Sequence, residues 1–121
     1  METERLSIRR FSPEDWQDLH EYLSQENVVK FEPYGVFTQE ECRQEAARRA
    51  GDPSFWAVCL KDCGKLIGNV YLAKGEFDTW ELGFVFGERY QGKGYATEAA
   101  RALVSDVFQS KPAKPSQWSN G

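Results

Sequence analysis

The sequence predicts one α/β domain of the α+β kind. The chain of 121 residues is long enough for a single domain with a modest core. Two strand-like segments, 55–60 and 66–73, are separated by a five-residue turn and predict a β-hairpin. A third strand, 80–86, leads through a glycine-rich turn directly into the most regular helical pattern of the chain. Strands and helices in this order indicate a sheet flanked by helices.

The first half of the chain carries one further strand and two helix starts. Residues 5–11 alternate between apolar and polar side chains, which is typical of a strand. Ser12 and Pro13 are the residue types that open a helix, and the apolar stripe Trp16, Leu19 and Leu23 follows. We interpret residues 27–37 as a loop.

Thr38 and Glu41 have the spacing of a capping box and predict a second helix that ends near Ala50. Its apolar face is thin. We therefore expect this helix to lie at the surface or to line a mobile wall of the site.

The last predicted helix has a broad apolar stripe, made by Ala96, Ala99, Ala100, Leu103, Val104, Val107 and Phe108. Glu98, Arg101 and Asp106 fall outside this stripe, and we expect them only to solvate the exposed side. Residues 110–121 contain two prolines and no periodicity. We expect a domain at 1–109 and a disordered or non-native tail at 110–121.

Composition excludes several classes of function. The formal charge of -4 argues against nucleic-acid binding through a basic face. We expect no membrane segment, because no apolar run approaches the roughly 20 residues that a spanning helix needs. The N-terminus lacks the order of a secretory signal. Three cysteines without a metal-ligand pattern predict free thiols and a cytoplasmic protein that needs no metal.

The turn between the last strand and the last helix is suited to bind an anion. The first N–H groups of a helix lack partners, and the helix dipole makes that end positive. Gly92 and Gly94 allow a bulky group to approach the backbone, while Arg89 and Lys93 add positive charge. A linked pair of phosphates is therefore the predicted ligand.

Two phosphate-binding motifs fit this turn poorly. Gly87, Gly92 and Lys93 match a nucleoside-triphosphate loop, but Gly94 stands where that loop needs Ser or Thr for magnesium. A dinucleotide-binding turn requires three glycines at a different spacing.

The same turn resembles the acetyl-coenzyme A signature of the GNAT superfamily of N-acetyltransferases. The segment Arg-Tyr-Gln-Gly-Lys-Gly at 89–94, followed by Tyr-Ala-Thr-Glu-Ala at 95–99, is similar to the ribosomal-protein acetyltransferase (RimJ/RimL-like) branch. Leu-Ser-Ile-Arg-Arg-Phe at 6–11 and Leu-Ile-Gly-Asn at 66–69 also fit that branch. The resemblance covers about residues 5–109.

This resemblance implies a mixed, mostly antiparallel sheet flanked by helices, and an enzyme that moves an acetyl group to a primary amine by direct attack. Acetyl-CoA would be the cosubstrate, and the acceptor would be a small molecule or a protein N-terminus. Glu81 would be the catalytic base, and Phe31, Tyr34 and Phe37 would line the acceptor site. The coenzyme would be bound by Phe84, Val85, Phe86, Arg89, Gln91, Gly92, Lys93, Gly94, Tyr95 and Ala96.

Family members continue with a further strand, helix and hairpin, so we expect a partial fold that lacks this C-terminal portion. The strand 82–86 would then become a sheet edge, and edges with unpaired backbone groups favour association. A homodimer is therefore expected. The alternative function is a catalytically incompetent module that binds CoA or a protein partner.

Overall fold

The fold is a four-stranded antiparallel sheet with strand order β1-β2-β3-β4. The structure is a computed structural model that describes residues 1–30, 32, 35–76 and 79–110, except for the side chains of 107–110. The strands are β1 (Leu6–Arg9), β2 (Phe55–Leu60), β3 (Leu66–Lys74) and β4 (Trp80–Phe86). The predicted hairpin and third strand are confirmed. This architecture is the partial, mostly antiparallel sheet that the family resemblance implies.

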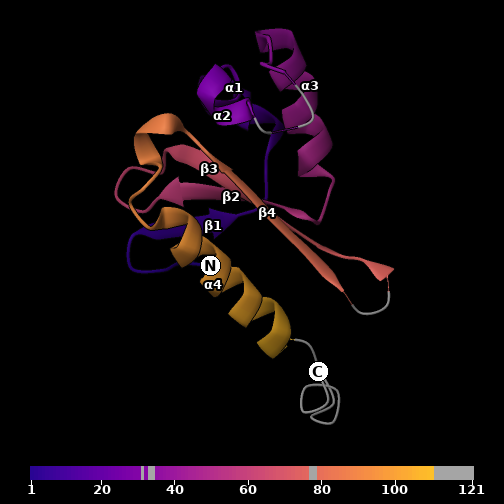
Figure 1. The fold of residues 1–121 in the computed structure, drawn as a ribbon, viewed down its shortest axis with the longest axis vertical. Coiled ribbons are helices and arrows are strands. Elements are labelled where there is room, and N and C mark those ends of the chain that lie inside the picture. Colours follow the sequence, from indigo (N-terminus) through magenta and orange to yellow (C-terminus); the bar gives the residue numbers. More distant parts are fainter. Residues whose placement is uncertain (31, 33–34, 77–78, 111–121) are drawn as a thin grey trace.

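Helices cover both faces of the sheet (Figure 1). The helices α1 (Trp16–Leu23), α2 (Glu26–Val29) and α3 (Gln39–Ala50) lie on one face. The helix α4 (Tyr95–Ser110) lies on the other. Two short 3-10 helices, η1 (Pro13–Asp15) and η3 (Glu88–Tyr90), precede α1 and α4.

Local capping signals fix two of the helix starts. Thr38 and Glu41 form the predicted capping box at α3. Ser12 caps η1 as predicted, and Asp15 bonds back to it and completes a second capping box. The interpretation of residues 27–37 as a loop is wrong at its start, because α2 includes residues 27–29. This single turn buries Val29 in the core, so tertiary packing stabilises a helix too short to be marked by periodicity.

The sheet separates two hydrophobic clusters, one under each helical layer. The cluster toward α1 and α3 consists of Phe11, Leu19, Tyr22, Leu23, Val29, Cys42, Ala46, Ala57, Cys59 and Leu66. The cluster toward α4 consists of Leu6, Ile8, Val58, Ile67, Val70, Leu72, Phe86, Ala99 and Leu103. Neighbouring residues of β2 belong to opposite clusters, as expected for a strand covered on both faces.

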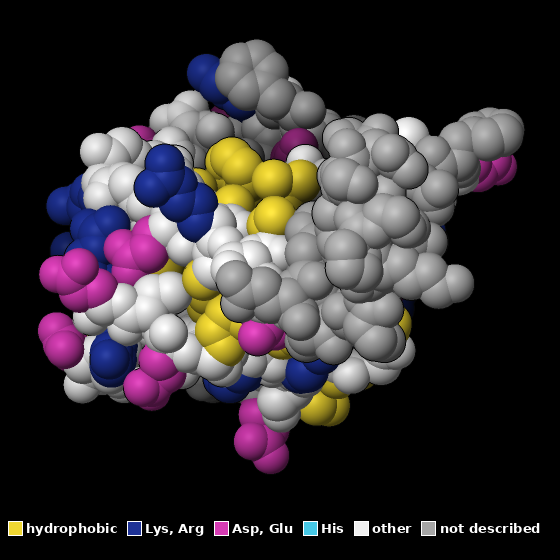
Figure 2. All heavy atoms as spheres, turned by 90° about the horizontal axis from the view of Figure 1, so that it is seen from below, with side chains coloured by type: hydrophobic (Ala, Val, Ile, Leu, Met, Phe, Trp, Pro, Cys, Tyr) yellow, Lys and Arg dark blue, Asp and Glu magenta, His cyan; other side chains and the backbone are white. Residues whose placement is uncertain are grey.

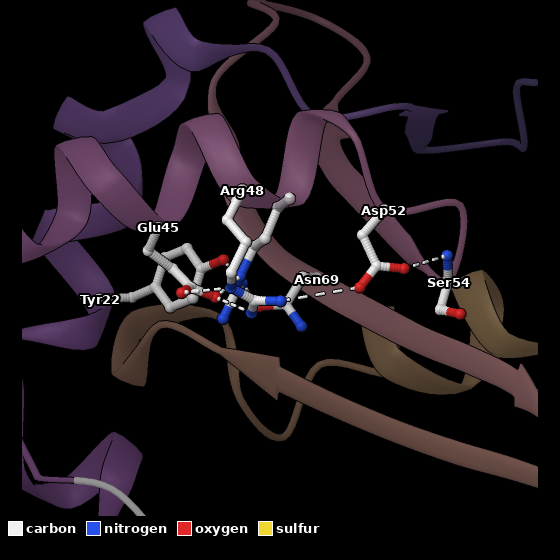
Figure 3. A network of polar contacts seen from close by, with 7 residues as sticks. Tyr22, Glu45, Arg48, Asp52, Ser54 and Asn69 are labelled. Carbon is white, nitrogen blue, oxygen red and sulfur yellow. Dashed lines mark hydrogen bonds and ion pairs between the residues drawn. The ribbon is translucent and has the colours of Figure 1, made fainter.

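A buried arginine anchors the inner face of α3, while the outer face of this helix is exposed, as expected for a helix at the surface. Arg49 is 4% exposed. Its Nη1 donates to Asn69 Oδ1 on β3 at 3.1 Å, and its Nε donates to Glu45 at 2.6 Å. The hydroxyl of Tyr22 on α1 donates to the same Asn69 oxygen at 2.8 Å (Figure 3). The network ties α1 and α3 to the centre of the sheet.

Acidic charge inside this network is stabilised by the two arginines. Burial acts to raise the pKa of Glu45, but hydrogen bonds from Arg48 and Arg49 hold it below its usual value. Glu45 therefore stays ionised in the folded state at neutral pH. The stability that this carboxylate contributes is present above its unfolded pKa and is lost as the pH falls through its lower, folded value.

The three cysteines are free thiols, as predicted. Burial raises the pKa of Cys42 to about 11 and also raises the pKa of Cys59, so both thiols stay protonated at neutral pH. Cys63 lies exposed in the β2–β3 turn. Within the described ranges, no helix is both long and apolar enough to span a bilayer.

Replacing Arg49 by Leu should destabilise the fold by about 3 kcal/mol, because Glu45 and Asn69 lose a buried partner. Urea denaturation followed by tryptophan fluorescence measures this loss. Arg48→Leu is the matched control: Arg48 binds the same carboxylate from the same helix, but its side chain is 56% exposed. The control should cost less than about 1 kcal/mol. Equal losses for the two variants would contradict the anchoring role of Arg49.

Candidate coenzyme-binding site

The turn between β4 and α4 holds two glycines in the left-handed region. Gly92 has φ 75° and Gly94 has φ 83°. A side chain at either position would be strained by this conformation, whatever space surrounds it. The turn follows η3, whose start is fixed by the hydrogen bond from Gly87 N–H to the Ile67 carbonyl at 3.0 Å.

This conformation leaves a run of backbone N–H groups without acceptors. No hydrogen bond among the described residues uses the N–H of any residue from Gly92 to Ala96. The first intrahelical bond of α4 runs from Glu98 N–H to the Gly94 carbonyl at 3.0 Å. Free N–H groups at the positive end of a 16-residue helix form a site for an anion.

Side chains of the turn divide into exposed charges and packed aromatics. Arg89 and Lys93 are exposed, so their charges are available to a ligand. Tyr90 and Tyr95 pack against the α4 cluster with ring centroids 6.4 Å apart, and Ala96 packs there too. Tyr95 and Ala96 can therefore offer a ligand mainly their backbone.

The N-terminal segment is bonded to the start of α4, a contact that sequence reasoning missed. Arg5 donates from Nε to Glu98 Oε1 at 2.6 Å and from its backbone N–H to Glu98 Oε2 at 3.0 Å. Thr3 donates its hydroxyl to the same carboxylate. Arg5 Nη1 also donates to the Lys93 carbonyl at 3.0 Å.

The expectation that Glu98 only solvates an exposed surface is therefore wrong. Burial acts to raise the pKa of Glu98, but hydrogen bonds from Thr3 and Arg5 hold it below its usual value. No local pattern could reveal this role, because Glu98 and its partners are more than 90 residues apart in sequence.

The outer edge of β4 offers a second set of backbone groups. Gly87 N–H bonds to Ile67 and Gly75 N–H bonds to Thr79, which fixes the alternation of the β3–β4 ladder. Odd-numbered residues of β4 therefore point their N–H and C=O groups at β3, and even-numbered residues point theirs outward. Gln91 Nε2 donates a hydrogen bond of 2.9 Å to the outward carbonyl of Phe86. Among the described residues, the outward groups of Leu82 and Phe84 have no partner.

The same two residues expose apolar side chains on the α4 face of the sheet. Leu82 is 46% exposed and Phe84 is 51% exposed. Hydrophobic side chains are visible on the lower side of the molecule (Figure 2). Val85 and Phe86 are instead packed into the two clusters. The backbone of Val85 also faces β3, so of these two residues only Phe86 has backbone groups on the outer edge.

The remaining predicted residues are the proposed base and the three aromatic residues of the proposed acceptor site. Glu81 is exposed on β4, six positions before Gly87, and its side chain shares the α1–α3 face with Val85. Phe37 is half-buried against the cluster on that face, and Phe31 and Tyr34 lie outside the described residues. A shallow hollow between α1 and η3 includes Arg89 and Tyr90 but none of residues 91–96.

The family of the chain follows from its match to a known family model. Residues 5–118 match the model described as acetyltransferase (GNAT) domain. The chain belongs to this family. The predicted family resemblance is thereby confirmed, and the described residues contain no cluster of His, Cys, Asp and Glu that could hold a metal.

Named relatives support the same assignment. The chain is 44% identical over 110 residues to YnaD of Bacillus subtilis, which bears the name of an uncharacterized N-acetyltransferase; this match covers 88% of the chain and 64% of YnaD. A GNAT-family acetyltransferase structure from Bacillus anthracis has a TM-score of 0.84 and 38% identity, over 90% of this chain and 66% of that one.

The ribosomal-protein branch is also represented. A Vibrio cholerae structure provisionally named a ribosomal-protein-serine acetyltransferase has a TM-score of 0.71 and 26% identity, over 89% of this chain and 66% of that one. The chain thus spans less than two thirds of the length of each of these three relatives.

Proposed function

We propose that the chain binds acetyl-CoA and belongs to an enzyme that transfers the acetyl group to a primary amine. The observation that carries this proposal is the run of free N–H groups from Gly92 to Ala96 at the positive end of α4. Family membership supports it, since acyl transfer from acetyl-CoA is typical of this family.

The coenzyme would lie along β4 and end at the turn. Its pyrophosphate would accept hydrogen bonds from the N–H groups of residues 92–96, with Arg89 and Lys93 nearby to balance its charge. The Gln91 side chain holds the turn against the end of β4. The amide groups of the pantetheine arm would pair with the outward backbone groups of Leu82 and Phe84, as an added strand would.

The transfer needs a neutral amine beside the thioester. The amine nitrogen forms a bond to the carbonyl carbon, the carbon–sulfur bond breaks, and the thiolate leaves and takes up a proton. Glu81 would accept the proton that the amine loses, directly or through one water. Its exposed side chain, on the face of β4 that also carries Val85, supports this role.

The acceptor would be a small-molecule amine or a protein N-terminus, approaching from the α1–α3 side. Phe37 lies on this side, and we keep Phe31 and Tyr34 as proposed wall residues. A cytoplasmic location would keep the three thiols reduced.

Gly92→Ala should weaken CoA binding about tenfold in calorimetry. Ala is strained in the left-handed conformation, and a backbone that moves to relieve this strain would point the neighbouring N–H groups away from the pyrophosphate. Gly64→Ala is the matched control. Gly64 has φ 77° against 75° for Gly92, neither has an atom within 4 Å of an added Cβ, and Gly64 lies in the β2–β3 turn. Both changes should cost similar stability, about 1–2 kcal/mol. Equal CoA affinities in the two variants would show that the turn is not part of the coenzyme site.

Glu81→Gln should lower the rate of acetyl transfer about 100-fold while leaving CoA affinity almost unchanged, because a base is lost and no coenzyme contact is lost. The assay follows thiol release with a panel of amines, including N-terminal peptides. Glu76→Gln, an exposed acid on the same hairpin, is the control and should keep the wild-type rate. Full activity in Glu81→Gln would exclude this role. CoA binding without transfer in the unmodified chain would favour the binding module.

We further propose that a second copy of the chain covers the β4 edge when CoA is absent. A two-fold axis at Gly83 would place Leu82 of one copy opposite Phe84 of the other. Their outward backbone groups could then bond in pairs, and their exposed side chains could pack together. The arm of CoA uses the same edge, so the two occupants exclude each other.

Light scattering at micromolar concentration should therefore give a dimeric mass without CoA and a monomeric mass with saturating CoA. Phe84→Lys should be monomeric in both conditions, because a charged Lys would then lie opposite Leu82 of the other copy and the apolar pair would be lost. A monomeric mass of the unmodified chain without CoA would contradict the dimer.

A further inference from the structure

The start of α4 and the turn before it are bonded to a segment that precedes β1, and Arg5 of this segment contacts three of their residues. Arg5 pairs with Glu98 in the first turn of α4 at 2.6 Å. The same guanidinium donates to the Lys93 carbonyl and lies 4.4 Å from the centroid of the Tyr95 ring. One side chain thereby contacts the residues on both sides of Gly94.

Arg5 also occupies the space on one side of Gly94. A Cβ added at Gly94 would lie 3.4 Å from Arg5 Nη2. The guanidinium thus packs directly against the left-handed position that precedes α4. Because the Lys93 carbonyl is held toward Arg5, the peptide plane between Lys93 and Gly94 is fixed, and the Gly94 N–H must point away from Arg5.

The carboxylate of Glu98 is itself held in place. It accepts from the Thr3 hydroxyl and the Arg5 backbone N–H as well as from the Arg5 side chain. The backbone of this N-terminal segment is fixed in turn to β1, since Thr3 N–H donates to Leu6 at 2.9 Å and Ile8 N–H donates to Met1 at 2.7 Å. The turn is therefore connected to the sheet by a route separate from β4.

We propose that Arg5 and Glu98 are positioning residues that clamp the turn in its anion-binding conformation before the coenzyme arrives. Coenzyme affinity would then depend on an ion pair that acts through the backbone of residues 93–95. Pre-organised N–H groups bind an anion more tightly because no conformational entropy is lost on binding. This inference rests on the proposed function for its ligand, but the clamp itself exists in the free protein.

Arg9 offers a close control on β1. Its guanidinium binds Asp15 through two hydrogen bonds of 2.8 Å, and its side chain is 42% exposed, as is that of Arg5. No contact of Arg9 among the described residues reaches the turn. Arg5→Lys and Arg9→Lys each keep the positive charge but replace the planar, multiply bonding guanidinium group by an ammonium group, at two sites of equal exposure.

The first measurement uses the free protein. Heteronuclear NOE values and amide exchange of Gly92, Lys93 and Gly94 should show a more mobile turn in Arg5→Lys and Glu98→Gln, and no change in Arg9→Lys. An unchanged turn in both clamp variants would overturn the proposal, even if either binds CoA weakly, because Arg5 would then contact the ligand directly.

The second measurement is CoA affinity by calorimetry. Arg5→Lys and Glu98→Gln should each raise the CoA dissociation constant about fivefold, the change expected for one lost hydrogen bond, and Arg9→Lys should change it less than twofold. Wild-type affinity in both clamp variants would also overturn the proposal. If the unmodified chain does not bind CoA, the proposed function is refuted but the clamp is not. The clamp is tested separately, by the mobility measurements on the free protein.

Discussion

The start of α4 is the constraint on which the rest of the site depends. Among the described residues, the five successive N–H groups from Gly92 to Ala96 have no acceptor, because Gly92 and Gly94 hold the left-handed conformation and Tyr95 and Ala96 are the first residues of α4. Under the proposed function, a chain with a formal charge of -4 would bind an acidic coenzyme through these N–H groups, which act at short range. The free energy of each N–H contact is small, so the turn must hold all of them in one orientation.

The surrounding fold supplies that rigidity from three directions. Gln91 bonds the turn to the end of β4, Gly87 bonds it to β3, and Arg5 bonds it to the segment before β1. On the opposite face, Arg49 joins α3 to β3 through Asn69. Buried polar contacts thus fix one face of the sheet, and the other face supports α4 and the turn that precedes it.

Sequence reasoning succeeded where the signal was local. Ser12 with Pro13 and the capping box at Thr38 marked helix starts, and the glycine-rich turn marked the candidate site, because each depends on neighbouring residues. It failed where partners are distant. Arg49 was missed because a basic residue near a helix end gives no sign of burial. Glu98 was misread because Arg5, which makes it structural, lies 93 positions away. The α2 turn depends on burial of Val29, which periodicity cannot reveal in four residues.

The most direct test of the central claim is a titration of the ¹⁵N-labelled chain with CoA, followed by amide chemical shifts. The account predicts that the amide resonances of Gly92, Lys93, Gly94, Tyr95 and Ala96 move the most and saturate together. The amide of Gly64, another left-handed glycine, should stay in place. Unmoved resonances at residues 92–96 under millimolar CoA would contradict the account.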